Sequence, residues 1–134
     1  MNNLLSFFLL LAKADAIMTR RLSCHGLTFA DFMILHYLNE APEGKMRRID
    51  LAESIGLTAS SITRMLIPME KIGLISRDVN ERDARARYAS LTPAGKNLLD
   101  DATETIKNKI EDMITDQQRN NIPELTKTLS SIIH

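Results

Sequence analysis

Residues 49–73 of the chain read IDLAESIGLTASSITRMLIPMEKIG, which is two short amphipathic helical patterns with a glycine between them. The first pattern predicts a helix that stops at Gly56, and the second predicts a helix capped by Thr58 and closed by Gly73. The second helix has one apolar stripe at helical spacing, made of Ile62, Met65, Leu66, Met69 and Ile72. Two short helices joined by a tight turn predict a helix-turn-helix, whose second helix typically enters the major groove of DNA.

Pro68 lies inside the second pattern, where it removes the hydrogen bond to the carbonyl of Arg64. We therefore expect a kink or a slight opening of the helix at this point. Because the apolar stripe continues past Pro68, the pattern still predicts one helix, with the kink behind its N-terminal half.

The outer face of the second helix is polar near its N-terminus. Small hydroxyl side chains allow a helix to approach base edges closely, and an arginine can bind guanine through two hydrogen bonds. The positive end of the helix dipole also favours phosphate. The candidate DNA contacts on this helix are Thr58, Ser60, Ser61, Thr63 and Arg64. These residues also fit an ordinary solvated helix surface, and that alternative stays open.

The segment after the helix pair predicts a β-hairpin, with strands at 74–79 and 86–91 and a polar tip between them. Basic side chains on a protruding hairpin can reach the narrow minor groove, where the electrostatic potential is most negative. The candidate contacts here are Arg77, Arg82, Arg85 and Arg87, with Asp83 placed to pair with Arg85. A solvated charged turn is the alternative interpretation.

Helical patterns flank this central part on both sides. Residues 3–22 predict a largely apolar first helix, which a partner chain would have to cover. The run from Thr28 to Asp31 is a capping-box pattern that begins a second helix. Thr92-Pro93 begins a long helix to about residue 118, and Asn120-Asn121 separates it from a last helix. The predicted fold class is therefore mainly α with a small two-stranded sheet.

Several runs of the central part resemble the MarR family of regulators. They are residues 51–58, 62–66 and 70–77, and Arg82-Asp83-Ala84-Arg85 followed by residues 90–95. The resemblance implies a winged helix-turn-helix with long terminal dimerisation helices and a small two-stranded wing. It implies that the second helix of the pair enters the major groove and that a wing arginine enters the minor groove. Ala84 stands where the family often has a basic tip residue, so contact by the tip would rest on Arg82 and Arg85.

The resemblance extends over nearly the whole chain and implies one domain over residues 1–134. Residues 1–27 and 93–134 would form the dimerisation helices, and residues 28–92 would form the DNA-binding lobe. The function expected on this basis is a sequence-specific regulator, in the first place a repressor, that binds a pseudo-palindromic operator in duplex DNA as a homodimer. The alternative is a winged-helix protein-interaction module without specific DNA binding.

Charge and composition agree with this expectation. The net charge is zero, but residues 45–96 hold ten Lys/Arg and six Asp/Glu, a net charge of +4, and the rest of the chain carries −4. The basic middle favours phosphate as a partner. A single cysteine allows no disulfide framework within the chain, which fits a cytoplasmic protein. The apolar run at residues 4–11 fits a helix better than a signal peptide because no Lys or Arg precedes it.

The sequence shows no phosphate loop, no supported nucleophile with its base, and no glycine-rich cofactor turn. We therefore expect no enzyme activity, no catalytic residues, no metal site and no cofactor. The resemblance implies a possible small aromatic or phenolic effector bound near the junction of the first two helices. The candidate residues for it are Arg20, Arg21, Met33 and His36. An ordinary surface role for these side chains is the alternative.

Overall fold

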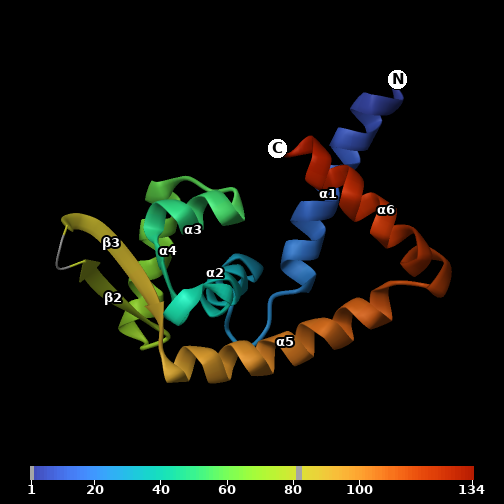
Figure 1. Cartoon of the computed structure of the whole chain (residues 1–134). Coiled ribbons are helices and arrows are strands. Elements are labelled where there is room, and N and C mark those ends of the chain that lie inside the picture. Colours follow the sequence, from blue (N-terminus) through green and yellow to red (C-terminus); the bar gives the residue numbers. More distant parts are fainter. Residues whose placement is uncertain (1, 81–82) are drawn as a thin grey trace.

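The computed structural model describes residues 2–80 and 83–134, with side chains for all of these except 78–80 and 83–86. A lobe of helices and a small sheet forms one end of the molecule. The helix α5 runs from this lobe to the other end, where α6 turns back toward α1 (Figure 1). The elements in chain order are α1 (Asn3–Arg21), α2 (Phe29–Glu40), η1 (Pro42–Gly44), β1 (Lys45–Arg47), α3 (Arg48–Ile55), α4 (Ala59–Lys71), β2 (Ile75–Asn80), β3 (Asp83–Leu91), α5 (Pro93–Met113) and α6 (Asp116–Ile132).

The hydrophobic core lies in the lobe, between α2, α3, α4, the sheet and the first half of α5. Its largest fully buried side chains are Ile34, Leu35, Leu38, Leu51 and Ile62. Burial of each such side chain contributes about 1.5–3 kcal/mol. Because α5 adds Leu99 and Ala102 to the same core, the lobe and the long helix form one packed body.

The helix pair forms as the sequence predicts. Gly56 ends α3 with a φ of +86°, in the left-handed region that glycine adopts at little cost. Thr58 caps α4, because its hydroxyl oxygen accepts a hydrogen bond of 3.1 Å from the N–H of Ser61. The apolar stripe faces the core, where Ile62 and Leu66 are buried. These contacts fix the direction in which α4 presents its outer face.

Ile49 and Ile72 are the most exposed of the large apolar residues of the helix pair and do not reach the core. Ile49 is 57% exposed and Ile72 is 70% exposed. Ile72 follows the last helical residue of α4 as its C-cap, so the stripe ends at Met69 rather than at Ile72. Pro68 lies within α4, which continues through it as one helix, as predicted.

The sheet has three antiparallel strands in the order β1-β3-β2, whereas the sequence predicted two. The extra strand, β1, is only three residues long, which is too short for alternation to reveal it. The strand β3 also begins earlier than predicted, because the ladder continues past a bulge near Val79 to the pair Asn80↔Asp83. The charged residues of this segment hid the strand, since a ladder is built from backbone groups and does not require apolar side chains.

The register of the sheet decides which side chains face α4. Residues paired across antiparallel strands lie on the same face. The pairs Arg77↔Ala89 and Val79↔Arg87 therefore place both arginines on the face of buried Ala89. The pair of Tyr88 with Arg47 lies on the opposite face.

The break between the last two helices lies at residues 114–115, so its predicted position at Asn120-Asn121 is wrong. The cause is a capping box at Thr115. The Thr115 hydroxyl accepts from the N–H of Gln118 at 3.2 Å, and the Thr115 N–H donates to the Gln118 side chain at 2.9 Å. Across this corner, Arg119 forms an ion pair with Glu111 and lowers the pKa of that carboxyl group. The hydrogen bond from Arg119 is the larger cause, and its positive charge is the smaller one.

The connection from α1 to α2 lies along α5 and holds α1 in place. The Lys109 ammonium donates to the carbonyl oxygens of Arg21 at 3.2 Å and Ser23 at 3.0 Å. His25 Nε2 lies 2.7 Å from Thr105 Oγ1. These contacts join the end of the first helix to the middle of the long helix.

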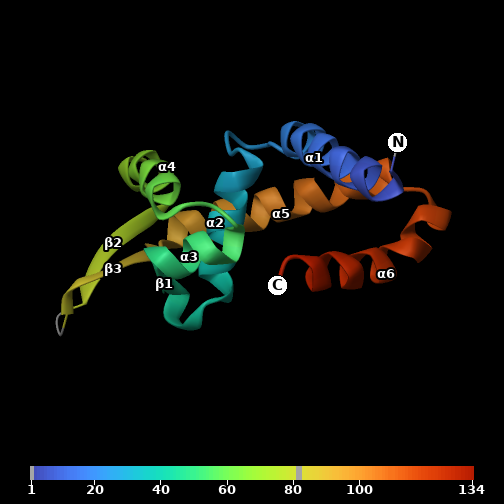
Figure 2. The ribbon, with the colours of Figure 1, turned by 90° about the horizontal axis from the view of Figure 1, so that it is seen from above.

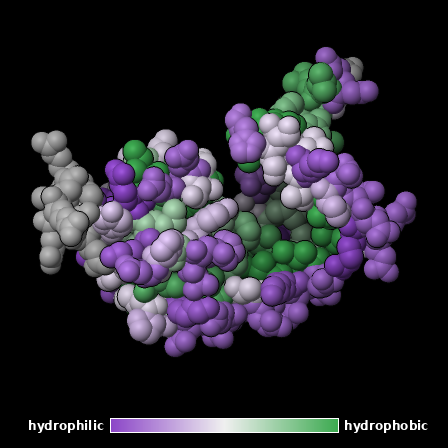
Figure 3. Space-filling view, viewed as in Figure 1, coloured by the Kyte–Doolittle hydropathy of each residue, from purple (hydrophilic) through white to green (hydrophobic). Residues whose placement is uncertain are grey.

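The helices α1 and α6 project beyond the lobe (Figure 2), and neither buries a single residue in the isolated chain. Apolar surface is visible along the start of α1 and in the hollow beside α5 (Figure 3). The exposed large apolar residues of the two helices are Leu4, Leu5, Phe8, Leu9, Leu10, Ile122, Leu125 and Ile132. Within the described residues, no helix has the length and apolar character needed to cross a bilayer.

Candidate nucleic-acid interface

The N-terminal half of α4 lies on the surface of the lobe beside the sheet (Figure 1). Thr58, Ser60 and Arg64 are exposed, and Ser61 and Thr63 are half-buried. This arrangement follows from the apolar stripe, because burial of Ile62 and Leu66 leaves Ser60 and Arg64 on the outer face of the helix. The structure therefore brings the five candidate residues of this helix together at one end.

The hydroxyl groups at the start of α4 order one another. Thr58 Oγ1 lies 3.3 Å from Ser60 Oγ and donates to Ser61 Oγ at 2.9 Å. The Arg64 guanidinium donates to the same Ser61 oxygen at 3.5 Å, which is a long and weak hydrogen bond. Most donors of this exposed guanidinium therefore face solvent, in a position where they are available to a partner.

Thr63 has a partner inside the lobe. Its hydroxyl accepts a hydrogen bond of 3.3 Å from Nη1 of Arg48, the first residue of α3. Arg48 is not among the candidate contacts predicted from the sequence. The basic pair Arg47-Arg48 before the first helix of the pair was the only signal for it, and that signal does not say which of the two turns inward.

The wing adds basic residues beside α4. Arg77 is exposed and forms an ion pair of 3.0 Å with Glu70 of α4, and Arg87 is exposed on the same face of the sheet. Arg82 lies outside the described residues, and the side chains of Asp83 and Arg85 are also outside them. The predicted contacts of these three side chains therefore stay predictions.

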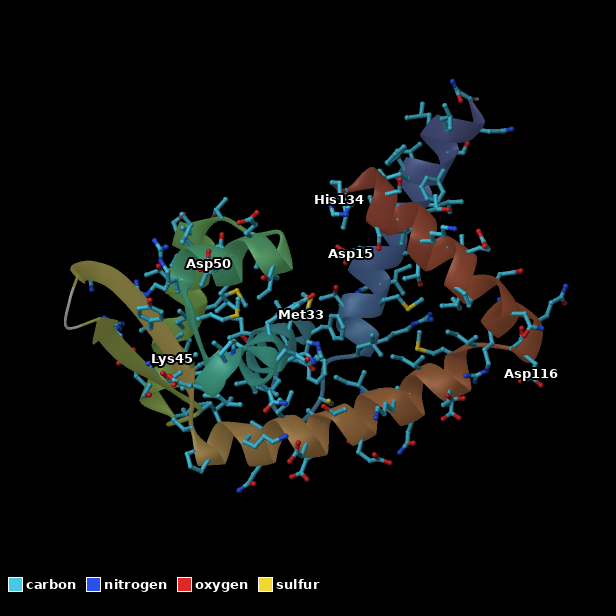
Figure 4. The ribbon with its side chains drawn as sticks, in the orientation of Figure 1. Asp15, Met33, Lys45, Asp50, Asp116 and His134 are labelled. Atoms are coloured by element: carbon cyan, nitrogen blue, oxygen red, sulfur yellow. The ribbon has the colours of Figure 1, made fainter. Side chains whose placement is uncertain are left out.

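The four candidate effector residues are placed on two helices. Arg20 and Arg21 are exposed in the last turn of α1. Met33 is half-buried on α2, on the side turned toward α1 (Figure 4), and His36 is exposed on α2 between the rings of Phe32 and Tyr37.

None of these four residues lines either of two cavities in the described part of the chain. One, of about 430 Å³, lies at the end of α2 beside β1 and is lined by Tyr37, Lys45 and Tyr88 among others. The other, of about 340 Å³, lies between α1 and α6 and is lined by apolar residues such as Phe7, Leu10 and Leu129.

Taken together, an exposed helix N-terminus with hydroxyl groups and an arginine lies beside a sheet face with two more arginines. This combination can donate hydrogen bonds to phosphate oxygens and to base edges. Among the described residues, no group of three His, Cys, Asp or Glu side chains is placed to hold a metal ion.

The comparisons with known proteins agree with this geometry. Residues 27–86 match the model of the MarR family. The transcriptional regulator BldR from Sulfolobus solfataricus has a TM-score of 0.81 and 26% identity, over 99% of this chain and 98% of its own. The transcriptional repressor CouR, solved on a 23-mer DNA duplex, has a TM-score of 0.80 and 25% identity, over 92% of this chain and 89% of its own.

A third structure, BpsR from Bordetella bronchiseptica, has a TM-score of 0.77 and 19% identity, over 93% of this chain and 98% of its own. At this identity the likeness concerns the fold alone. The family match covers the whole helix pair and the start of the wing, and the two closer structures extend the likeness over the terminal helices. Over residues 27–86 the chain is similar to the MarR family, and nearly its whole length shares the fold of the transcriptional regulators BldR and CouR.

Proposed function

We propose that the protein is a repressor that binds a pseudo-palindromic operator in duplex DNA as a homodimer. The observation that carries the proposal is the exposed start of α4, where Ser60 and Arg64 are uncovered next to the arginine-bearing face of the wing. In this arrangement α4 enters the major groove and its N-terminus faces phosphate. The wing arginines then reach the adjacent minor groove.

A second copy of the chain is the proposed cover of α1 and α6. Helices of 19 and 17 residues with no buried residue gain little stability from their own chain. Contiguous apolar surface of this kind marks an interaction site. A two-fold axis through these helices would present two copies of α4 to two half-sites, which a pseudo-palindrome supplies.

Release by a small aromatic effector is part of the same proposal. In BpsR, 6-hydroxynicotinic acid regulates the binding of that protein to DNA. In this chain, the positions near the end of α1 and on α2 are the proposed site, with Arg20, Arg21, Met33 and His36 as candidate contacts. An anionic group would pair with an arginine there, and an aromatic ring would pack against Met33.

Arg64→Ala is expected to lower affinity for the operator by about 10- to 100-fold and to relax the base preference at one position of each half-site. The reason is that Arg64 is the exposed guanidinium at the reading end of α4. Fluorescence anisotropy with the operator and with single-base variants of it measures both effects. Lys107→Ala, which removes one exposed charge from α5, is the matched control and should change neither.

Arg85→Ala, by contrast, is expected to weaken binding to most sequences to a similar degree, since a minor-groove contact reads shape rather than a base code.

The proposal itself is tested by titrating a duplex pool with the protein at two salt concentrations. Binding that weakens linearly with the logarithm of salt concentration supports it. Absence of binding at about 50 mM salt would contradict it and favour a protein-interaction module.

A further inference from the structure

Arg48 lies where α3, α4 and the wing meet. It begins α3 directly after β1, and its side chain enters a narrow cleft between α4 and the sheet face of Arg77 and Ala89. Among the residues that line the cleft are Arg48, Glu70 and Arg77. One guanidinium therefore lies between the helix that carries Arg64 and the base of the wing.

The polar contacts of Arg48 are few and specific. Its Nη1 donates to Thr63 Oγ1 at 3.3 Å. Its Nε is buried and has no hydrogen-bond partner among the described residues. The carboxylate in the cleft, Glu70, is held by Arg77 at 3.0 Å and not by Arg48.

The electrostatic environment of Arg48 is unfavourable for a cation. Burial lowers its pKa most, the charges of Arg77 and Arg87 lower it further, and Glu70 raises it. Among the side chains that the structure describes in this region, three arginines thus share one carboxylate. Replacing a partly desolvated, poorly paired cation by an apolar side chain of similar length is often neutral or stabilising. Stability therefore does not explain an arginine here, and function is the better explanation.

We propose that Arg48 is a positioning residue for DNA recognition, which fixes Thr63 on α4 and sets the spacing between α4 and the base of the wing. Docking α4 in the major groove and the wing in the next minor groove requires one fixed spacing between them. The hydrogen bond to Thr63 orients Arg48 on the α4 side, and the ion pair between Arg77 and Glu70 closes the other side of the cleft against the base of the wing. This inference rests on the proposed function and adds a residue that reads no base itself.

The test compares Arg48→Met with Arg47→Met. Both variants remove one positive charge at adjacent positions, but Arg47 is exposed and is paired with Tyr88 on the opposite face of the sheet. For each variant, anisotropy titrations give the affinity for the operator, the affinity for a scrambled duplex and the salt dependence of both. Thermal denaturation gives the stability.

A positioning role predicts that Arg48→Met lowers operator affinity by at least about 10-fold while affinity for the scrambled duplex changes by less than about twofold. The slope of log affinity against log salt concentration should equal that of Arg47→Met. The melting temperature should equal or exceed that of the wild-type protein. A loss that is equal on both duplexes, with a salt slope reduced by about one, would instead identify a direct phosphate contact and overturn the proposal. A fall in melting temperature without a change in specificity would overturn it in favour of a structural role.

Two further variants keep the test decisive if Arg48→Met does not fold. Arg48→Lys keeps the charge but not the planar guanidinium, so it should lose specificity and keep the salt slope. In a cycle with Thr63→Val, the double variant Arg48→Lys/Thr63→Val should lose no more specificity than Thr63→Val alone, because Arg48 acts through Thr63. Additive losses would overturn the proposal. If the wild-type protein binds the operator no more tightly than the scrambled duplex, the proposed function itself fails. That result is distinct from a failure of the role proposed for Arg48.

Discussion

Leu10→Glu is expected to convert the proposed dimer to a monomer and to lower its operator affinity by at least about 100-fold. Leu10 is 65% exposed in the isolated chain and lines the cavity between α1 and α6. Because its surroundings within one chain are sparse, the substitution should leave the lobe folded. A carboxylate buried without a partner in the proposed interface is costly, so the dimer dissociates. Each monomer then binds one half-site without the gain from the second.

Light scattering gives the mass of the variant at micromolar concentration, and anisotropy gives its affinity for the operator. Asn97→Glu is the matched control, since it adds the same charge at an exposed position near the start of α5. This control should remain a dimer with operator affinity near that of the wild type. A dimeric Leu10→Glu protein with full operator affinity would show that α1 and α6 are not the interface.

Gly95→Ala is expected to lower the free energy of unfolding by about 3 kcal/mol. Gly95 is buried in the first turn of α5, where its N–H donates to the capping hydroxyl of Thr92 at 3.0 Å. A Cβ at this position would lie well inside contact distance of the Leu74 carbonyl oxygen and 2.9 Å from the Leu91 side chain. The clash involves backbone, so a rotamer change cannot relieve it.

The Leu74 carbonyl oxygen also accepts from the Thr92 N–H at 3.2 Å and lies 2.9 Å from the Thr92 hydroxyl oxygen. The substitution therefore strains the junction between the helix pair and the long helix. Chemical denaturation of Gly95→Ala and Gly56→Ala separates the two costs of adding a Cβ. Gly56 has a positive φ but open space around it, so its variant should lose only about 1 kcal/mol. Equal losses in the two variants would contradict the steric explanation.

The elements that the sequence predicted well are those with two independent signals. The helix that starts after Thr28 has both an apolar pattern and a capping box, and the structure shows both hydrogen bonds of that box, at 3.0 and 3.1 Å. The helix α4 has an apolar stripe, a Thr58 cap and a glycine after its end. In each case the local hydrogen-bonding pattern and the burial pattern point to the same boundaries.

Two elements were not predicted correctly. One depends on a contact that is remote in sequence, and the other has a capping signal close to a residue pair that was interpreted as a helix breaker. The strand β1 exists because β3 pairs with it, which no pattern within three residues can reveal. The start of α6 had a signal, the Thr115 to Gln118 capping box, but Asn120-Asn121 was taken as the stronger helix breaker. Exposed asparagines are tolerated within a helix at a small cost, whereas a complete capping box fixes a start.

The candidate interface was predictable as a face and not as a set of contacts. Periodicity correctly placed Ser60 and Arg64 outside, because it reports which side of α4 is buried. It could not show that Thr63 accepts from Arg48, or that Glu70 holds Arg77, since these pairs join separate elements. The unfavourable position of the Arg48 guanidinium follows from the packing of α4 on the wing, which only the folded chain defines.

Selection of bound sequences from a random duplex library would show whether the purified protein reads a DNA sequence as a symmetric dimer. We expect an enriched pseudo-palindrome with half-site centres about 10 base pairs apart, one helical turn, to match two copies of α4. Recovery of no motif, together with binding that moderate salt abolishes, would contradict it and leave the arginines of α4 and the wing as a charged surface without sequence recognition.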